Sequence, residues 1–182
     1  MNVLLDILGA TLIGGIIFTM FFNLNMYSSQ ARYSSNTELQ LMQNSKTLAE
    51  MLTYDLRKIG YKHKGQSLIT AQKKRISFYA DIDTNGVEDV VGYALSDSTD
   101  VSFTSNPHDK VLLRVVNGDT AKGPSLGITD LRFSYLDVKQ QPTAVLDDVK
   151  YIKAEIWVES PEPVNDKYIF TYWEMTINPR NM

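Results

Sequence analysis

The 182-residue chain contains no cysteine. This absence excludes a disulfide scaffold, thiol chemistry and any metal site built on cysteine. It leaves the cellular compartment open, because many exported proteins also lack disulfides. Histidine is almost as scarce: His63 and His108 are the only two, and each falls in an expected loop without a partner at motif spacing. We therefore expect neither histidine to be catalytic or to bind zinc.

Other chemical signatures are missing as well. The sequence contains no phosphate-binding loop and no dinucleotide fingerprint. Its net charge of −3 gives no basic footprint of the kind that nucleic-acid binding requires. We therefore expect a protein that is not an enzyme, with neither a nucleic acid nor a small-molecule substrate as its partner. A composition of 43% hydrophobic and 21% charged residues is typical of a folded protein.

The N-terminal stretch, residues 3–24, is almost wholly apolar and is broken chiefly by Asp6. It is long enough to cross a bilayer, too long for the apolar region of a signal peptide, and followed by no small-x-small cleavage site. We expect a retained, single-pass membrane helix. The first cation is Arg32, which by the positive-inside rule would place the C-terminus in the cytoplasm. A chain recorded without a basic leader would show the same asymmetry, so the sequence leaves the orientation open.

The residues after this stretch continue as an amphipathic helix without proline or glycine until Gly60. From Leu41 the residues of one face recur at helical spacing, which predicts a face that packs on the C-terminal half. Gly60 is expected to stop the helix, with Arg57 and Lys58 in the last turn. One helix over residues 3–59 would be roughly 85 Å long, more than a bilayer needs. The expected face comprises Leu41, Met42, Ser45, Leu48, Ala49, Leu52, Leu56 and Ile59.

Beyond Gly60 the hydrophobic period changes from 3.6 to 2. Residues 75–81 and 89–95 alternate around Thr84-Asn85-Gly86, which predicts a β-hairpin. We expect an α+β fold in which the long helix packs on an antiparallel sheet of five to seven strands, since no crossover helix separates the strands. The expected division is a membrane segment at 1–24, an amphipathic continuation at 25–60 and a β domain at 61–182. Further strands are expected at 110–116, 127–136, 149–158 and 167–177.

This order of elements resembles the type IV pilin architecture, and several local strings are similar to W-type minor pilins and the related J-type pseudopilins of type II secretion. The resemblance covers nearly the whole chain. It implies a pilin-like fold and a structural subunit that anchors in the cytoplasmic membrane and primes, caps or joins a filament through the N-terminal helices of other subunits. The domain would lie in the periplasm or outside the cell. The strings are Leu56-Arg-Lys-Ile-Gly-Tyr61, Ile76-Ser-Phe-Tyr-Ala-Asp-Ile-Asp-Thr-Asn-Gly86, Val91-Gly-Tyr93, Leu113-Arg114, Gly127-Ile-Thr-Asp-Leu-Arg-Phe-Ser-Tyr135 and Thr176-Ile-Asn-Pro-Arg-Asn181.

Asp6 is the principal candidate for an assembly residue. Members of the resembled family carry a basic leader ending in glycine, then a phenylalanine, with a glutamate as the fifth mature residue. This sequence has none of the three, but Asp6 would be fifth if Asn2 were first. The resemblance then implies that Asp6 accepts a hydrogen bond from a neighbouring subunit's N-terminal ammonium. The alternative is an anion in the first helical turn, near the headgroups, that the helix dipole favours.

Small residues in the same segment are candidates for close helix packing. Ala10 with Gly14, and Thr11 with Gly15, have small-xxx-small spacing, and Gly9 precedes them. Small residues let helices approach closely in lipid or in a filament core. Glycine is also common in membrane helices for no such reason, so the sequence leaves both interpretations open.

The hairpin turn resembles the opening of a calcium-binding loop. Asp81, Asp83 and Asn85 supply oxygen ligands at positions 1, 3 and 5, glycine follows at position 6, and Asp89 is at position 9. Position 12 is Gly92, where an EF-hand requires a bidentate glutamate, so a complete EF-hand is excluded. Two interpretations stand: a looser calcium site, or a turn in which Asp and Asn bond to the local backbone.

The leading functional expectation is therefore a filament subunit. The competing one, from a different class, is a lone membrane-tethered extracytoplasmic binding domain that is not assembled into filaments. Such a domain would hold a ligand at the acidic hairpin or at exposed aromatic side chains. The sequence does not distinguish adhesion, motility, DNA uptake and secretion.

Overall fold

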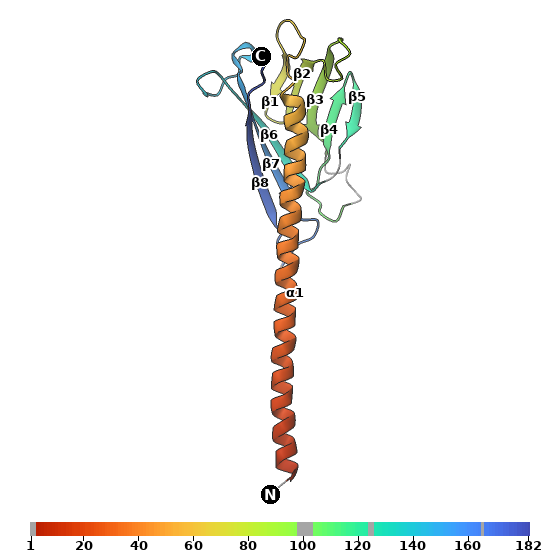
Figure 1. The fold of residues 1–182 in the computed structure, drawn as a ribbon, viewed down its shortest axis with the longest axis vertical. Coiled ribbons are helices and arrows are strands. Elements are labelled where there is room, and N and C mark those ends of the chain that lie inside the picture. The colour runs from red at the N-terminus through yellow and green to blue at the C-terminus, as the bar shows by residue number, and fades with distance from the viewer. Residues whose placement is uncertain (1–2, 98–103, 124–125, 165) are drawn as a thin grey trace. The chain divides into compact units, whose positions relative to one another are not determined.

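A computed structural model describes residues 3–97, 104–123, 126–164 and 166–182 (Figure 1). These residues form one long α-helix, α1 (Val3–Leu56), followed by eight β-strands and a short 3-10 helix. The expected α+β class, a long N-terminal helix on antiparallel β-structure, is confirmed. By packing, the chain divides into two compact units, residues 1–37 and residues 38–182.

The part of α1 in the second unit packs on the β-structure through one face. Seven of the eight residues expected on this face are buried. Helical spacing brings six of them to one side of α1, and the seventh, Ile59, follows the end of the helix. Met42 is the exception: 56% of it is exposed, so its assignment to the buried face was wrong. The buried residues are Leu41, Ser45, Leu48, Ala49, Leu52, Leu56 and Ile59.

The helix ends at Leu56, three residues earlier than expected. Beyond it the backbone tightens, because Lys58 N donates to Asp55 O at 2.9 Å instead of to a residue four positions back. Arg57 and Lys58 therefore follow the helix and do not lie in its last turn. Gly60 has a φ of +75°, the left-handed conformation expected of a terminating glycine. Its N–H donates to the Tyr79 carbonyl at 2.9 Å, which ties the end of the helix to the sheet.

Five strands form an antiparallel sheet whose spatial order follows the chain. The expected hairpin is confirmed: Arg75 pairs with Ala94 at one end, and Ala80 with Asp89 at the other. The first and last strands of this sheet were not predicted. The five are β1 (Leu68–Gln72), β2 (Arg75–Ala80), β3 (Asp89–Leu95), β4 (Leu112–Val116) and β5 (Asp119–Lys122).

The remaining strands form a separate sheet, in the order β6-β7-β8, where the sequence had indicated one sheet for all. In β7 every second residue is buried, the pattern of a strand with one face on the core. The strand β8 pairs with β7 alone, so its other edge is unpaired among the described residues. The elements are β6 (Ile128–Leu136), the 3-10 helix η2 (Leu146–Asp148), β7 (Tyr151–Glu159) and β8 (Phe170–Ile177).

A single hydrophobic core joins the C-terminal part of α1 to both sheets. The sheets also meet through hydrogen bonds, because Phe133 N in β6 donates to the Lys73 carbonyl at 2.7 Å, in the turn between β1 and β2. The Tyr135 hydroxyl lies 3.0 Å from the Gln72 carbonyl in the same place. The β1–β2 turn is thus fixed by β6, and β2 continues from this turn into its hairpin with β3.

Candidate functional site

The first unit is a helical segment with apolar side chains on all sides. Its hydrophobic residues are exposed around the whole circumference, for example Leu4 at 83%, Phe18 at 69% and Leu24 at 68%. The helix is long and apolar enough to cross a membrane, by length and composition. A soluble helix normally carries a polar face. The exposed apolar side chains of this segment are therefore suited to contact with lipid or with another protein.

Asp6 lies in the first turn of α1 and is exposed. No hydrogen bond or ion pair joins its carboxylate to another described residue. It is also the only charged residue before Arg32. In an apolar medium such a carboxylate requires a partner, because an unpaired charge there is costly.

The small residues of this segment have open space beside them. A Cβ atom added to Gly9, Gly14 or Gly15 would meet nothing within 4 Å, and Ala10 is exposed. Packing among the described residues therefore gives no reason for glycine at these positions. A neighbouring helix would supply such a reason.

The acidic loop, residues 81–89, follows β2 and ends on the first residue of β3, and it brings three carboxylates together. One oxygen from each of Asp81, Asp83 and Asp89 lies within 4.8 Å of the others. Asp81 and Asp89 are buried, whereas Asp83 is exposed. The structure therefore gathers three of the four candidate calcium ligands by their carboxylates.

Local hydrogen bonds fix the shape of the acidic loop. The Asp83 carboxylate accepts the backbone N–H of Asn85 at 3.0 Å and its side-chain amide at 2.9 Å. The Asn85 amide oxygen accepts the Val87 N–H at 2.7 Å. Asp89 accepts the Ile82 N–H at 3.1 Å and the side-chain amide of Asn117, in the turn between β4 and β5, at 2.7 Å. Asn85 thus holds Asp83 in place, and Asp89 closes the base of the loop.

Asp81 pairs with a lysine just beyond the end of α1. Its Oδ2 atom accepts Lys62 Nζ at 2.7 Å and the Gly86 N–H at 3.0 Å. The Lys62 hydrogen bond holds the pKa of the Asp81 carboxyl below its ordinary value, against the opposing effect of burial. The same bond raises the pKa of the Lys62 ammonium. The other oxygen, Asp81 Oδ1, is buried and has no hydrogen-bond partner among the described residues.

Both histidines have carboxylate partners that the sequence did not indicate. His63 Nδ1 lies 2.7 Å from Glu88 Oε2, and its ring stacks on Tyr79 with centroids 4.6 Å apart. His108 Nδ1 lies 2.9 Å from Glu159 Oε2. Each is a pair of one histidine and one carboxylate. Within the described chain, neither histidine belongs to a group of three side chains that could hold a metal ion.

A serine-nucleophile pattern, Gly-x-Ser-x-Gly, also occurs at residues 123–127. Its serine, Ser125, lies outside the described residues. In hydrolases this pattern joins a strand to a helix, and the helix follows the nucleophile directly. Here the pattern is followed by strand β6, so the structural context of that motif is missing.

A buried ionic cluster, which sequence reasoning missed, links α1 to the five-stranded sheet. Asp55 on α1 is 2% exposed, and its Oδ2 atom accepts Arg114 Nε from β4 and the Tyr93 hydroxyl from β3, each at 2.6 Å. Burial and the neighbouring Asp55 raise the pKa of the Tyr93 hydroxyl. These two partners lie 38 and 59 residues from Asp55 in sequence, so no local pattern could have identified the cluster.

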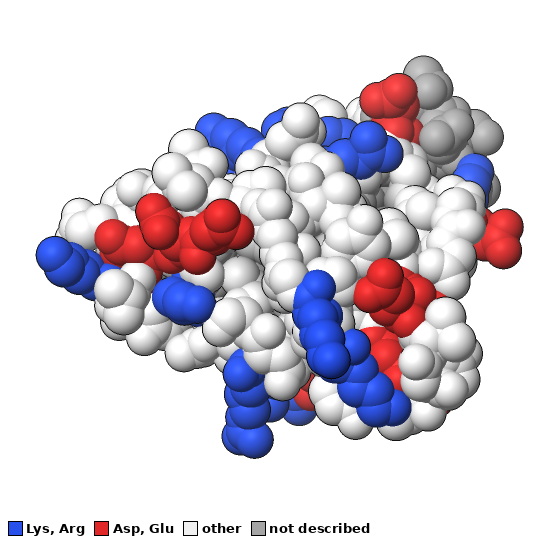
Figure 2. All heavy atoms as spheres, turned by 90° about the horizontal axis from the view of Figure 1, so that it is seen from above, with Lys and Arg blue, Asp and Glu red and all other residues white. Residues whose placement is uncertain are grey.

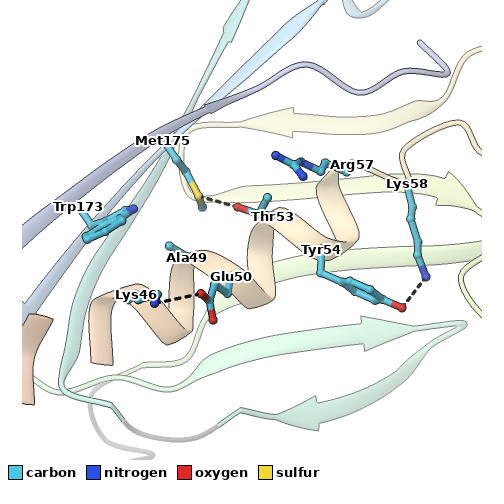
Figure 3. A pocket seen from close by; sticks show the side chains of 9 residues that line it. All are labelled: Lys46, Ala49, Glu50, Thr53, Tyr54, Arg57, Lys58, Trp173 and Met175. Carbon is cyan, nitrogen blue, oxygen red and sulfur yellow. Dashed lines mark hydrogen bonds and ion pairs between the residues drawn. The ribbon is translucent and has the colours of Figure 1, made fainter. Parts of the chain in front are cut away.

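An apolar groove of about 600 Å³ runs between α1 and β8 (Figure 3). Trp173 and Met175 line it from the sheet, and Ala49 and Thr53 face them from the helix. Thr53 Oγ1 lies 3.2 Å from the Met175 sulfur. Trp173 is 38% exposed although its side of β8 faces the core. The groove therefore leaves part of the inner face of an edge strand uncovered.

Charges on the face seen in Figure 2 occur in small groups of both signs. Lys, Arg, Asp and Glu side chains are interspersed among uncharged residues, with no continuous region of one sign among the residues drawn in colour or white. Such a face produces no strong long-range field.

Comparisons with protein-family models, with curated proteins and with solved structures found no match.

Proposed function

We propose that this chain is a minor pilin-like or pseudopilin-like structural subunit of a type IV pilus or a type II secretion-like filament. The first half of α1 would anchor it in the cytoplasmic membrane as a single-pass helix, with residues 38–182 on the outer side. The observation that carries the proposal is that one helix, α1, belongs both to the apolar segment and to the folded domain. The same α1 contributes an apolar segment with no covered side and, further on, a face of the domain's core.

The proposed mechanism is an exchange of lipid for protein around the apolar segment. Before assembly, lipid would surround residues 3–24, and in the filament the helices of other subunits would replace that lipid. Gly9, Gly14 and Gly15 leave room for such close approach, since an added Cβ would meet nothing in this chain. Subunits that join by head-to-tail contacts build open filaments when those contacts do not close into a ring. The local strings that resemble W-type minor pilins add independent support.

Asp6 would direct this exchange. A carboxylate in an apolar helix draws a partner charge, and the N-terminal ammonium of a neighbouring subunit is the partner we propose. Withdrawal of the helix from lipid without that pairing would leave the carboxylate buried and unpaired. The pairing would therefore favour correctly registered subunits over others.

The decisive experiment compares Asp6→Ala with Asp6→Glu in the native organism. Asp6→Ala should lower incorporation into sheared filaments about tenfold or more, the factor expected for one charge-assisted hydrogen bond. Asp6→Glu should retain most incorporation because it keeps the carboxylate. Thr19→Ala, a change of one polar side chain in the same segment, is the matched control. Equal incorporation of Asp6→Ala and wild type, at equal membrane levels, would overturn the assembly role.

Contacts in the filament can be tested by cysteine crosslinking, because the chain has no cysteine of its own. A single cysteine at Gly14 should crosslink to the helix of another subunit only in the assembled state. Genes for an assembly ATPase, a leader peptidase and other pilin-like helices should lie nearby. Their absence, together with no crosslink, would contradict the proposal.

The apolar groove between α1 and β8 favours a second candidate, a membrane-tethered binding domain that acts alone. Its lining includes Trp173, which is 38% exposed and offers apolar area for a ligand. Under this alternative Asp6→Ala would leave function intact, whereas Trp173→Ala would abolish it. Under the filament proposal the order of the two effects is reversed.

A further inference from the structure

The acidic loop contains a buried carboxylate oxygen that lacks a hydrogen-bond partner in the described part of the chain. Asp81 is 1% exposed, and its Oδ1 atom has no hydrogen-bond partner among the described residues. A buried carboxylate oxygen without a partner is costly, and native structures rarely leave one unexplained. The Asp81 carboxylate belongs to a group of three, with Asp83 and Asp89, in which one oxygen from each residue lies within 4.8 Å of the others. A metal cation bound by this group could supply the partner that the buried oxygen lacks.

A second buried oxygen without a partner, Asp109 Oδ1, provides a contrast. Among the described residues, Asp109 belongs to no group of three side chains that could hold a metal ion, whereas Asp81 does. Within the described chain, only the acidic loop combines a buried oxygen without a partner with two further carboxylates within ligand distance.

The kind of ligand set that the acidic loop offers favours calcium over magnesium. The three oxygens lie within 4.8 Å of one another, so one cation can contact all three. Calcium accepts irregular oxygen sets completed by carbonyls and water, whereas magnesium demands an octahedron.

We propose that the acidic loop is a calcium site in which the ion and Lys62 compete for Asp81. Asp81, Asp83 and Asp89 supply the carboxylates, and Asn85 positions Asp83 through its amide hydrogen bonds. The Lys62 ammonium, on a side chain that is 41% exposed, neutralises Asp81 in the absence of calcium and swings into solvent when the ion binds. A lysine stem is long and flexible enough for this movement.

A calcium ion at this site would stabilise residues 58–62, which follow the end of α1. Asp81 N donates to the Tyr61 carbonyl at 3.0 Å, and Lys58 Nζ donates to the Ile82 carbonyl at 2.8 Å. Residues 58–62 are therefore hydrogen-bonded to the loop at Asp81 and at the residue after it. Bound calcium would make the junction between α1 and the five-stranded sheet more rigid. Without calcium, the ion pair between Lys62 and Asp81 would hold this junction.

The test uses the full chain in detergent micelles, with calcium titrated by isothermal calorimetry. We expect a dissociation constant on the order of 0.1 to 1 mM, the range of extracellular calcium modules. At about 5 mM calcium the midpoint of thermal unfolding should rise by about 3 to 6 °C over a chelator control. The same concentration of magnesium should produce less than about a third of this shift.

Three variants make the test specific. Asp83→Asn changes an exposed ligand and spares the Lys62 pair, so it should weaken calcium binding about tenfold while the protein remains folded. Asp147→Asn, a change of an exposed carboxylate outside the acidic loop, should have no effect. Lys62→Gln should lower the calcium-free melting midpoint and tighten calcium binding several-fold, because the competitor is removed.

The critical result is the pair of opposite effects expected for Lys62→Gln: a lower melting midpoint without calcium, and tighter binding of calcium. No calcium heat and no thermal shift at about 5 mM calcium would overturn the site. Equal shifts with calcium and magnesium, or an equal loss of binding in Asp83→Asn and Asp147→Asn, would also overturn it. Calcium binding that weakens in Lys62→Gln would overturn the competition. Filament incorporation is not measured in any of these assays, so their failure leaves the proposed function untouched.

Discussion

Arg114 Nε lies 2.6 Å from Asp55 Oδ2, and this ion pair fixes the helix α1 to strand β4. The pair is unequal: Asp55 is almost fully buried, whereas the Arg114 side chain is 31% exposed. Arg114→Met would leave a buried carboxylate with the Tyr93 hydroxyl as its remaining partner. We expect it to lower the free energy of unfolding by about 3 kcal/mol, as for other buried charges that lose a partner. Urea denaturation of the full chain in detergent measures this change.

Simultaneous replacement of the whole cluster provides the control. The triple variant Asp55→Leu, Tyr93→Phe and Arg114→Met removes every polar group of the cluster at similar volume. We expect it to be more stable than Arg114→Met alone, because no charge is left buried without a partner. If the triple variant is less stable than Arg114→Met, the interactions within the cluster contribute more to the free energy of unfolding than the unpaired Asp55 charge costs.

Gly60 should be intolerant of substitution at the end of α1. Its φ is +75°, and an added Cβ would collide with the Asn181 carbonyl oxygen. Gly118 has a φ of +92° but open space around it. Gly118→Ala therefore measures the cost of the left-handed conformation alone, about 1 kcal/mol. Gly60→Ala should cost at least about 1 kcal/mol more, since backbone must also move; equal costs in thermal unfolding would contradict the steric argument.

The buried face of α1 can be tested with two residues that the sequence placed on the same side. Leu52 is fully buried, whereas Met42 is 56% exposed. Leu52→Ala should lower the free energy of unfolding by about 2 to 5 kcal/mol, through lost burial and a cavity in the core. Met42→Ala should change it by less than about 0.5 kcal/mol. Similar costs in urea denaturation would show that the helix face is set differently.

Local sequence patterns predicted most of the elements because they depend on near neighbours. The alternation in β2 and β3 and the turn residues between them identified the hairpin, and Gly60 identified the region where the helix stops. β5 was missed because it is short and all four of its residues are exposed, so it carries no alternation. Met42 was misassigned because a helix face that follows period 3.6 is broad, and only the contacts with the sheets define its edge.

Long-range features of the candidate sites could not be predicted in the same way. The acidic loop was recognised because its carboxylates are close together in the sequence. Lys62, its competitor for Asp81, is 19 residues away and belongs to a different element. The separation into two sheets likewise depends on how β6 contacts the β1–β2 turn, which no single strand encodes. Sequence therefore locates a site when its residues are neighbours in the chain, and structure supplies the partners that folding brings in.

The ion pair between Lys62 and Asp81 should make stability depend on pH in acid. The folded-state pKa of Asp81 lies below its unfolded value of 3.8. A lowered pKa contributes stability that is complete above the unfolded value and is lost as the pH falls through the folded value. In metal-free buffer, wild type should thus be more stable than Asp81→Asn at about pH 6, and this advantage should shrink toward about pH 3.

The difference in stability between wild type and Asp81→Asn reports on Asp81 and not on other carboxyls with lowered pKa values. Asp130 and Glu174 also have lowered pKa values, so their protonation destabilises the fold in acid, but they are present in both proteins and cancel. Asp147→Asn should track wild type at every pH, because its carboxylate is exposed and outside the acidic loop. Urea midpoints measured at closely spaced pH values provide the comparison. An advantage of wild type that stays constant or grows as the pH falls would show that Asp81 is not held ionised by Lys62.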